Sequence, residues 1–170
     1  MTMHASLIFL MAVVWLAGCS RKEGPPQSPT EAAASAMSVV NVADSKTKSQ
    51  LLKGWHTVEQ GAWRWTERQF SVALKAPSPG KAATLQLNFS LPEVLIQRLR
   101  SVTLTATVGG EALAAETYTQ AGAHVYAQSV AGPALAGDVV RVDFSLDKAL
   151  PPGEIDAREL GVVVSSIRLD

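Results

Sequence analysis

The part of the sequence best suited to chemistry is a cluster of aromatic and charged residues between positions 55 and 65. It contains Trp55, Glu59, Trp63, Arg64 and Trp65. Exposed indole rings offer a flat apolar surface for stacking, and charged groups beside them can hydrogen-bond the polar edge of a ligand. In an extended strand, Trp63 and Trp65 lie on one face and Arg64 on the other. The alternative is that the rings pack in the core, where large aromatic side chains usually lie.

A second charged motif, Asp156-Ala157-Arg158-Glu159, precedes the last apolar stretch of the chain. The guanidinium of Arg158 can form a bidentate pair with a carboxylate or donate to a ligand hydroxyl. The alternative is a structural ion pair that fixes the final strand. Glu59 and Arg64, separated by a short connection, can also pair with each other.

Motifs for catalysis are missing from the sequence. After residue 18 the histidines are His56 and His124, with no HExxH and no cluster spaced for a metal. There is no GxSxG, no glycine-rich phosphate loop and no GxGxxG. Carboxylates are plentiful, but no spacing singles out a pair suited to glycoside hydrolysis. We therefore expect a non-enzymatic protein without a metal or a cofactor.

The first eighteen residues contain no Asp, Glu, Lys or Arg, and Leu7–Gly18 is an apolar run of twelve residues. A membrane-spanning helix needs about 20 residues, so the run is typical of a secretory signal peptide. The tetrapeptide Leu16-Ala17-Gly18-Cys19 resembles the lipobox of bacterial lipoproteins. The resemblance implies cleavage before Cys19, acylation of that residue, and anchoring to a membrane through lipid chains. Ser20, in place of the Asp that retains many lipoproteins at the inner membrane, favours the outer membrane.

The composition divides the chain into three parts. Residues 1–18 are the predicted lipoprotein signal peptide, and residues 19–50 are a flexible tether with prolines at positions 25, 26 and 29. Within the tether, Ser28 could cap a short helix. Residues 51–170 form the predicted folded domain. With 15 basic and 15 acidic residues, the chain lacks the basic excess of a nucleic-acid-binding surface. Its single cysteine excludes an internal disulfide and a multi-cysteine zinc site.

Apolar and polar residues alternate over 85–91, 102–108 and 140–146, which predicts half-buried strands. We expect further strands at 63–74, 111–118, 123–130 and 160–169. The alternation slips between Trp65 and Phe70 and between Val164 and Ile167, which predicts a bulge at each place. Gly109-Gly110 predicts a hairpin turn, and 93–100 has helical character. The sequence thus predicts an all-β, antiparallel β-sandwich of about seven to eight strands, jelly-roll-like or immunoglobulin-like in topology.

The order of these motifs resembles a family of small carbohydrate-binding or galactose-binding-like jelly-roll domains that are appended to bacterial glycosyltransferases. The pattern comprises a GW-x-x-x-E opening, an RW-T/S step, a hairpin ending in Gly, and a D-x-R-x-LG-V-x-V-x-x-I-x-L close. The matching positions are Gly54, Trp55, Glu59, Arg64, Trp65, Thr66, Gly110, Asp156, Arg158, Leu160, Gly161, Val162, Val164, Ile167 and Leu169. The resemblance covers residues 51–170 and implies a jelly-roll fold with a carbohydrate as ligand.

Two functional hypotheses follow. The first is a lipid-anchored module of the bacterial cell envelope, facing the periplasm or the cell surface, that binds a glycan. Its expected ligand-binding residues are Trp55, Glu59, Trp63, Arg64, Trp65 and Arg158. The second is a non-catalytic structural or assembly lipoprotein that docks another envelope protein. A long, exposed, uncharged edge strand would favour the second hypothesis.

Overall fold

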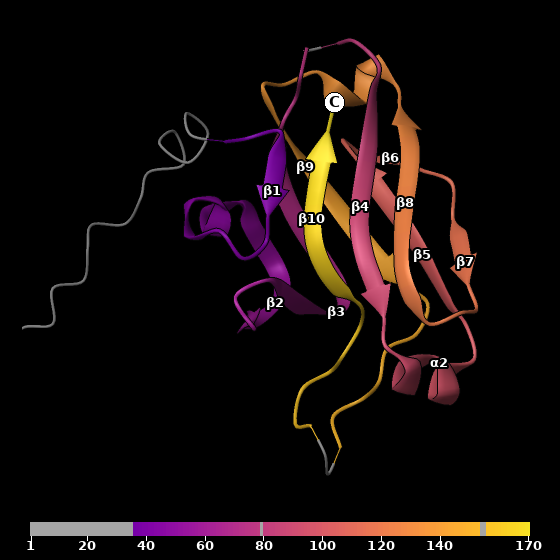
Figure 1. Ribbon diagram of the computed structural model, residues 1–170. Helices are drawn as coiled ribbons and strands as arrows, with labels where there is room; N and C mark the ends of the chain where they lie inside the picture. The colour runs from indigo at the N-terminus through magenta and orange to yellow at the C-terminus, as the bar shows by residue number, and fades with distance from the viewer. Residues whose placement is uncertain (1–35, 79, 154–155) are drawn as a thin grey trace, which may run out of the picture.

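The computed structural model describes residues 36–78, 80–153 and 156–170 (Figure 1). The predicted signal peptide, the lipobox cysteine Cys19 and the short helix predicted at Ser28 lie outside the described residues. Within these residues, no helix is both long enough and apolar enough to cross a membrane.

The described residues form ten strands, one α-helix and two 3-10 helices. In chain order the elements are β1 (Val39–Asn41), η1 (Ser45–Gln50), β2 (Leu51–Glu59), β3 (Trp63–Lys75), β4 (Ala83–Leu91), α2 (Glu93–Leu99), β5 (Val102–Val108), β6 (Glu111–Ala112), β7 (Glu116–Tyr118), β8 (Gly122–Val130), η2 (Gly132–Leu135), β9 (Val139–Leu146) and β10 (Val163–Leu169). Seven strands have seven or more residues, and β1, β6 and β7 have three or fewer. The sequence predicted about seven to eight strands, and six of the seven long strands, all but β2, lie where it placed them.

The strands form one curled antiparallel sheet whose two halves face each other as the layers of a β-sandwich (Figure 1). The first layer has the order β1-β10-β4-β8. The second has the order β2-β3-β9-β5, with β6 and β7 paired to β5. The layers are joined where the start of β3 pairs with the start of β10, Trp65 opposite Val163. The predicted all-β sandwich is confirmed.

The core lies between the layers and is filled by the inward residues of the alternating strands. In β4, β5 and β9 every second residue is buried, as the sequence pattern predicted. Phe70 of β3 stacks on Phe144 of β9, with ring centroids 4.9 Å apart. Helix α2 also appears where the sequence had helical character, and it buries Leu95. The turn at Gly109-Gly110 is confirmed, and both glycines have positive φ, as a two-residue hairpin turn requires.

Both predicted irregularities are present. In β10 the pairing with β4 shifts between Val164 and Ser166. In β3, Thr66 pairs with Trp55 and Ser71 with Lys53, so five steps along β3 match two along β2. At the same place β3 leaves β10 and joins β9. The slip in alternation therefore marks the point at which β3 passes from one layer to the other.

The folded domain begins earlier than the predicted boundary at residue 51. Val39–Asn41 pairs with β10, and Val40 and Val42 are fully buried. The side-chain amide of Gln50 donates to the backbone carbonyls of Met37 and Ala73. This stretch of the predicted tether therefore belongs to the sandwich. A strand of three residues is too short to produce a readable alternation.

The structure differs from the predicted strands in two further details. The single strand predicted at 111–118 is two short strands, β6 and β7, because the chain leaves β5 between them. Strand β2 was not predicted, and its exposure does not alternate regularly.

Candidate functional site

The tryptophans predicted to form a binding surface pack against the core. Trp65 is buried, with 9% of its surface exposed, and Trp63 packs against it edge to face, with ring centroids 6.5 Å apart. Trp55 packs edge-on against Phe70, and its indole Nε1 donates to the carbonyl of Ser71 over 2.8 Å. The three rings do not form one flat surface. Their arrangement is the core-packing alternative.

The guanidinium of Arg64 bonds backbone groups of the fold. Its Nε donates to the carbonyl oxygen of Val42, and its Nη1 donates to that of His56, both over 2.7 Å. The side chain thus joins three segments of backbone. The suggested pairing of Glu59 with Arg64 is wrong, because Glu59 pairs with another arginine.

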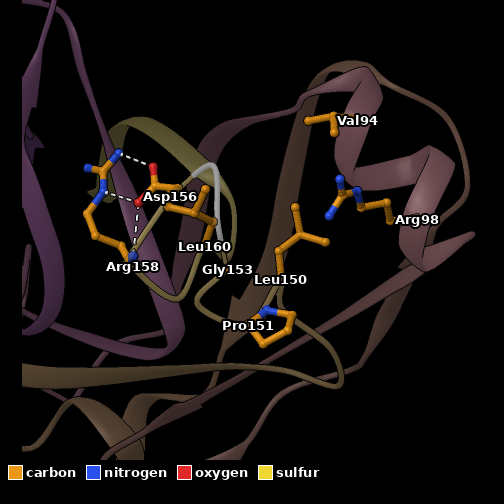
Figure 2. A pocket seen from close by; sticks show the side chains of 8 residues that line it. All are labelled: Val94, Arg98, Leu150, Pro151, Gly153, Asp156, Arg158 and Leu160. Atoms are coloured by element: carbon orange, nitrogen blue, oxygen red, sulfur yellow. Dashed lines mark hydrogen bonds and ion pairs between the residues drawn. The ribbon is translucent and has the colours of Figure 1, made fainter.

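That arginine is Arg158, in the loop before β10. Its Nε and Nη2 donate to the two carboxylate oxygens of Asp156 over 3.0 and 2.8 Å (Figure 2). Its Nη1 donates to Glu59 over 2.8 Å. About a third of each of these three side chains is exposed. We call these three residues the Arg158 network. It connects the β2–β3 hairpin to the loop, as expected of an ion pair that fixes the final strand.

The network shifts the pKa of Asp156 and that of Arg158. Hydrogen bonds from the Arg158 side chain, and then from its backbone N–H, lower the pKa of Asp156 to about 2. The same contacts, with Asp156 first and Glu59 second, raise the pKa of Arg158 above its ordinary value. Asp156 therefore stays ionised at any physiological pH. It can accept hydrogen bonds but cannot supply a proton as a general acid.

A pocket of about 380 Å³ lies beside the network, between α2 and the loop that precedes β10 (Figure 2). The base of this loop is held by paired backbone hydrogen bonds between Leu150 and Leu160, of 2.8 and 2.9 Å. The pocket combines an apolar wall with charged groups. Its lining residues are Val94, Arg98, Leu150, Pro151, Gly153, Asp156, Arg158 and Leu160.

Within the described residues, the network has unused hydrogen-bonding capacity. Arg158 has five N–H donors, and three of them are used by Asp156 and Glu59. The second oxygen of Glu59 accepts no hydrogen bond there. Fixed donors and acceptors of this kind can bind neighbouring hydroxyls of a ligand. No group of three His, Cys, Asp or Glu residues in this part of the chain could hold a metal ion.

Sequence reasoning identified part of this pocket and missed the rest. Arg158 was expected in a ligand site, and Asp156 was noted in the same motif. Glu59 was expected there too, but it pairs with Arg158 and is not among the residues that line the pocket. Val94 and Arg98 of α2, and Leu150 and Pro151 of the loop, were not expected. They are brought together by the packing of α2 near the loop, for which the linear sequence contains no signal.

A second hollow, of about 250 Å³, lies on the outer face of β3, β5 and β9. It contains another arginine and aspartate two residues apart, Arg141 and Asp143, whose closest atoms are 2.7 Å apart. Their side chains are 58% and 48% exposed, well above the values in the Arg158 network. This pair is a natural control for experiments on Arg158.

Comparisons with known proteins bear on the fold. No protein-family model matches the chain, and no curated protein matches it. Among solved structures, the CBM36-1 domain of a multidomain xylanase from the hindgut metagenome of Trinervitermes trinervoides is 9% identical, with a TM-score of 0.43. The alignment covers 78% of this chain and 94% of that domain.

Two other solved structures are similar at the same level. A CBM4 structure is 15% identical, with a TM-score of 0.34, and the alignment covers 78% of this chain and 81% of that one. Dimeric latent PorU from Porphyromonas gingivalis is 9% identical, with a TM-score of 0.41. The alignment covers 60% of this chain, which spans only 10% of PorU. These likenesses concern the β-sandwich fold alone.

Proposed function

We propose that this protein is a non-catalytic, lipid-anchored module of the bacterial cell envelope that binds a glycan in the pocket between α2 and the loop before β10. The observation that carries the proposal is the Arg158 network, which holds donors and acceptors in place beside an apolar wall.

Sugars present two kinds of surface, an apolar face of C–H groups and an edge of hydroxyls. Leu150, Pro151 and Leu160 can contact the first, and the polar atoms of Arg158 and Asp156 can bond the second. Small-molecule sites usually have this composition, with volumes of about 300–1,000 Å³. A pocket of about 380 Å³ therefore suits one or two sugar rings.

The network also favours binding because it is formed before a ligand arrives. Both carboxylates already fix the guanidinium plane, so little side-chain entropy is lost when a hydroxyl binds. Arg98, on the α2 side of the pocket, adds a positive charge that could pair with the carboxylate of an acidic sugar (Figure 2). Among the expected ligand residues, we assign direct contacts to Arg158, and we assign the positioning of its guanidinium to Glu59. We assign Trp55, Trp63, Trp65 and Arg64 to the support of the fold.

The charge of Asp156, which lines the pocket, fits ligand binding better than it fits glycoside hydrolysis. Glycoside hydrolysis needs one carboxyl group that is protonated at the working pH. Asp156, the carboxylate that lines the pocket, has the opposite property, a lowered pKa.

Membrane anchoring rests on the lipobox at Leu16-Ala17-Gly18-Cys19. Residues 20–35 then remain as the tether between the acylated Cys19 and the described domain, since residues near Val40 are part of the fold. Intact mass measurement of the membrane-extracted chain tests this. We expect a chain that begins at Cys19 and carries acyl groups, and a full-length unacylated chain would contradict it.

Glycan binding is tested by calorimetric titration of the full chain, kept in mild detergent, with neutral and uronic-acid-containing envelope oligosaccharides. Arg158→Lys keeps the charge but loses the bidentate geometry, so we expect the Kd to rise at least about tenfold. Val94→Glu places a charge on the exposed part of the pocket wall and should also weaken binding. The matched control, Arg141→Lys, should leave the Kd unchanged.

Thermal unfolding of each variant separates loss of the pocket from loss of the fold. The proposal fails if no oligosaccharide binds. It also fails if one binds and neither Arg158→Lys nor Val94→Glu alters its Kd.

A second candidate function, docking of another envelope protein, is favoured by a different observation. Strand β8 is a nine-residue edge strand without a charged residue. Such an edge can accept an additional strand from a partner.

A further inference from the structure

The edge of the first layer formed by β8 has none of the usual protection against strand pairing. Among the described strands, β8 pairs only with β4, in a continuous register from Gly122 opposite Leu91 to Val130 opposite Ala83. Its sequence, GAHVYAQSV, contains no Asp, Glu, Lys, Arg or Pro. Natural sheets normally protect an edge with charges, proline, bulges or short strands.

The other edges of the sandwich show these devices. Strand β1 has three residues. Strand β2 contains Lys53, and its pairing with β3 shifts at three places. Strand β5 is covered on its free side by β6 and β7. In the described part of the chain, β8 is thus the long and regular edge.

The hydrogen bonds between β4 and β10 show which backbone groups of β8 point away from the sheet. Thr84 and Asp170 exchange backbone hydrogen bonds, so even-numbered residues of β4 face β10 and odd-numbered residues face β8. The residues of β8 that bond β4 are therefore those paired with odd positions, Tyr126 opposite Leu87 among them. The N–H and C=O groups that point away from β4 belong to Ala123, Val125, Ala127 and Ser129.

All four of these residues are exposed, and Val125 is 49% exposed. Within the described residues, their outward N–H and C=O groups have no hydrogen-bond partner in the protein. They form a row of eight free backbone groups along one line.

We propose that β8 pairs with β8 of a second copy of this chain, antiparallel and about a two-fold axis at Tyr126. In this register Ala123 lies opposite Ser129 of the second copy, and Val125 lies opposite Ala127. Every outward residue then faces an outward residue, so all eight backbone groups of each strand find partners. Shifting the register by two residues leaves some of them unpaired.

The side chains are compatible with this register. The hydrogen-bonded pairs, Ala123 with Ser129 and Val125 with Ala127, have small side chains, and β8 contains no Asp, Glu, Lys or Arg that would lie opposite its own copy. Gln128 lies opposite His124 of the second copy and donates to the carboxylate of Glu116 in its own chain. A two-fold contact of this kind closes at the dimer and does not propagate into a fibre.

The chain's own tether is a poor occupant for this edge. Residues 20–35 contain three prolines, which lack the N–H that a ladder needs. Strand β1, the first described strand, lies on the opposite edge of the layer from β8 (Figure 1).

The test is amide hydrogen exchange of the full chain in mild detergent, measured at 10 µM and at 1 mM. Contacts between strand edges bury little surface, so we take a dimer Kd of about 100 µM. For this Kd, mass action lowers the fraction of monomer about fourfold between 10 µM and 1 mM. Exchange at Ala123, Val125, Ala127 and Ser129 should slow by about the same factor.

Two variants test the register, and one serves as the control. Val125→Lys adds a charge to the edge, and Ala127→Pro removes an outward N–H that makes no bond within the chain. Both should abolish the concentration dependence. The control is Val39→Lys, which adds the same charge to an exposed valine on the opposite edge, in β1, and should leave it intact.

Exchange that is independent of concentration in the unmodified chain would overturn the proposal. So would association that persists in both β8 variants, because it would then arise from lipid or another surface. Protection of the four amides by a different purified protein, without self-association, would assign the edge to that partner instead. None of these outcomes involves the Arg158 pocket, so they do not affect the glycan proposal.

Discussion

The close approach of β2 to β3 at Gly54 leads to a quantitative prediction about stability. Gly54 has a φ of +75°, and a Cβ added there would lie 2.0 Å from the carbonyl oxygen of Gln69 and 2.8 Å from the Cα of Phe70. Both neighbours are backbone atoms, which cannot rotate away. Gly54 lies where the β2–β3 register shifts between Lys53 and Trp55, so the glycine allows β2 to cross near β3.

Gly54→Ala should therefore destabilise the fold in two ways. A positive φ costs an alanine about 1–2 kcal/mol. Displacing packed backbone adds about 1–3 kcal/mol. The sum is about 2–5 kcal/mol, a large part of the stability of a domain of this size.

Gly110→Ala is the matched control because it separates the two contributions. Gly110 also has a positive φ, +90°, but nothing lies within 4 Å of an added Cβ. It should cost only the conformational part, about 1–2 kcal/mol. Denaturant unfolding, followed by tryptophan fluorescence, measures both variants. Equal losses at Gly54 and Gly110 would refute the close approach of the two strands.

Three other predictions concern charge and packing. Because the pKa of Asp156 is lowered in the folded state to about 2, the stability it contributes is present above its ordinary pKa near 3.8 and is lost as the pH falls toward 2. Unfolding of Asp156→Asn should therefore depend less on pH between 4 and 2, and an identical dependence would contradict the pairing with Arg158. Arg64→Met should cost about 1–3 kcal/mol in denaturant unfolding because two backbone carbonyls lose a charged donor, and an unchanged midpoint would contradict those contacts. In denaturant unfolding, Val40→Ala should destabilise the fold by about 1–3 kcal/mol, whereas Val39→Ala, at an exposed position, should be nearly neutral. Equal effects of the two substitutions would contradict the assignment of residues 39–41 to the folded domain.

The strands that the sequence indicates most directly are those in which buried and exposed residues alternate most strictly. Strands β4, β5 and β9 each have one buried face and one exposed face over their whole length, which the period of two records directly. Strand β2 obscures this pattern, because Gly54 and the register shifts turn successive side chains away from a fixed face.

The candidate site could be predicted only where its contacts are local. Asp156 and Arg158 are two residues apart and form their pair within one turn of the loop. Glu59 lies 99 positions from Arg158, so the sequence offered Arg64, its nearest arginine, as a partner. The packing of the β2–β3 hairpin against the loop decides between them, and that contact has no local signature.

The position of β10 has a consequence for the order of folding. This strand lies between β1 and β4 and also touches β3, yet it is synthesised after all three. Until it emerges, β1 lacks the strand with which it pairs and the two layers lack their junction at β3 and β10, so the hydrophobic interior is incomplete. The core of the sandwich can therefore be completed only after β10 has been synthesised.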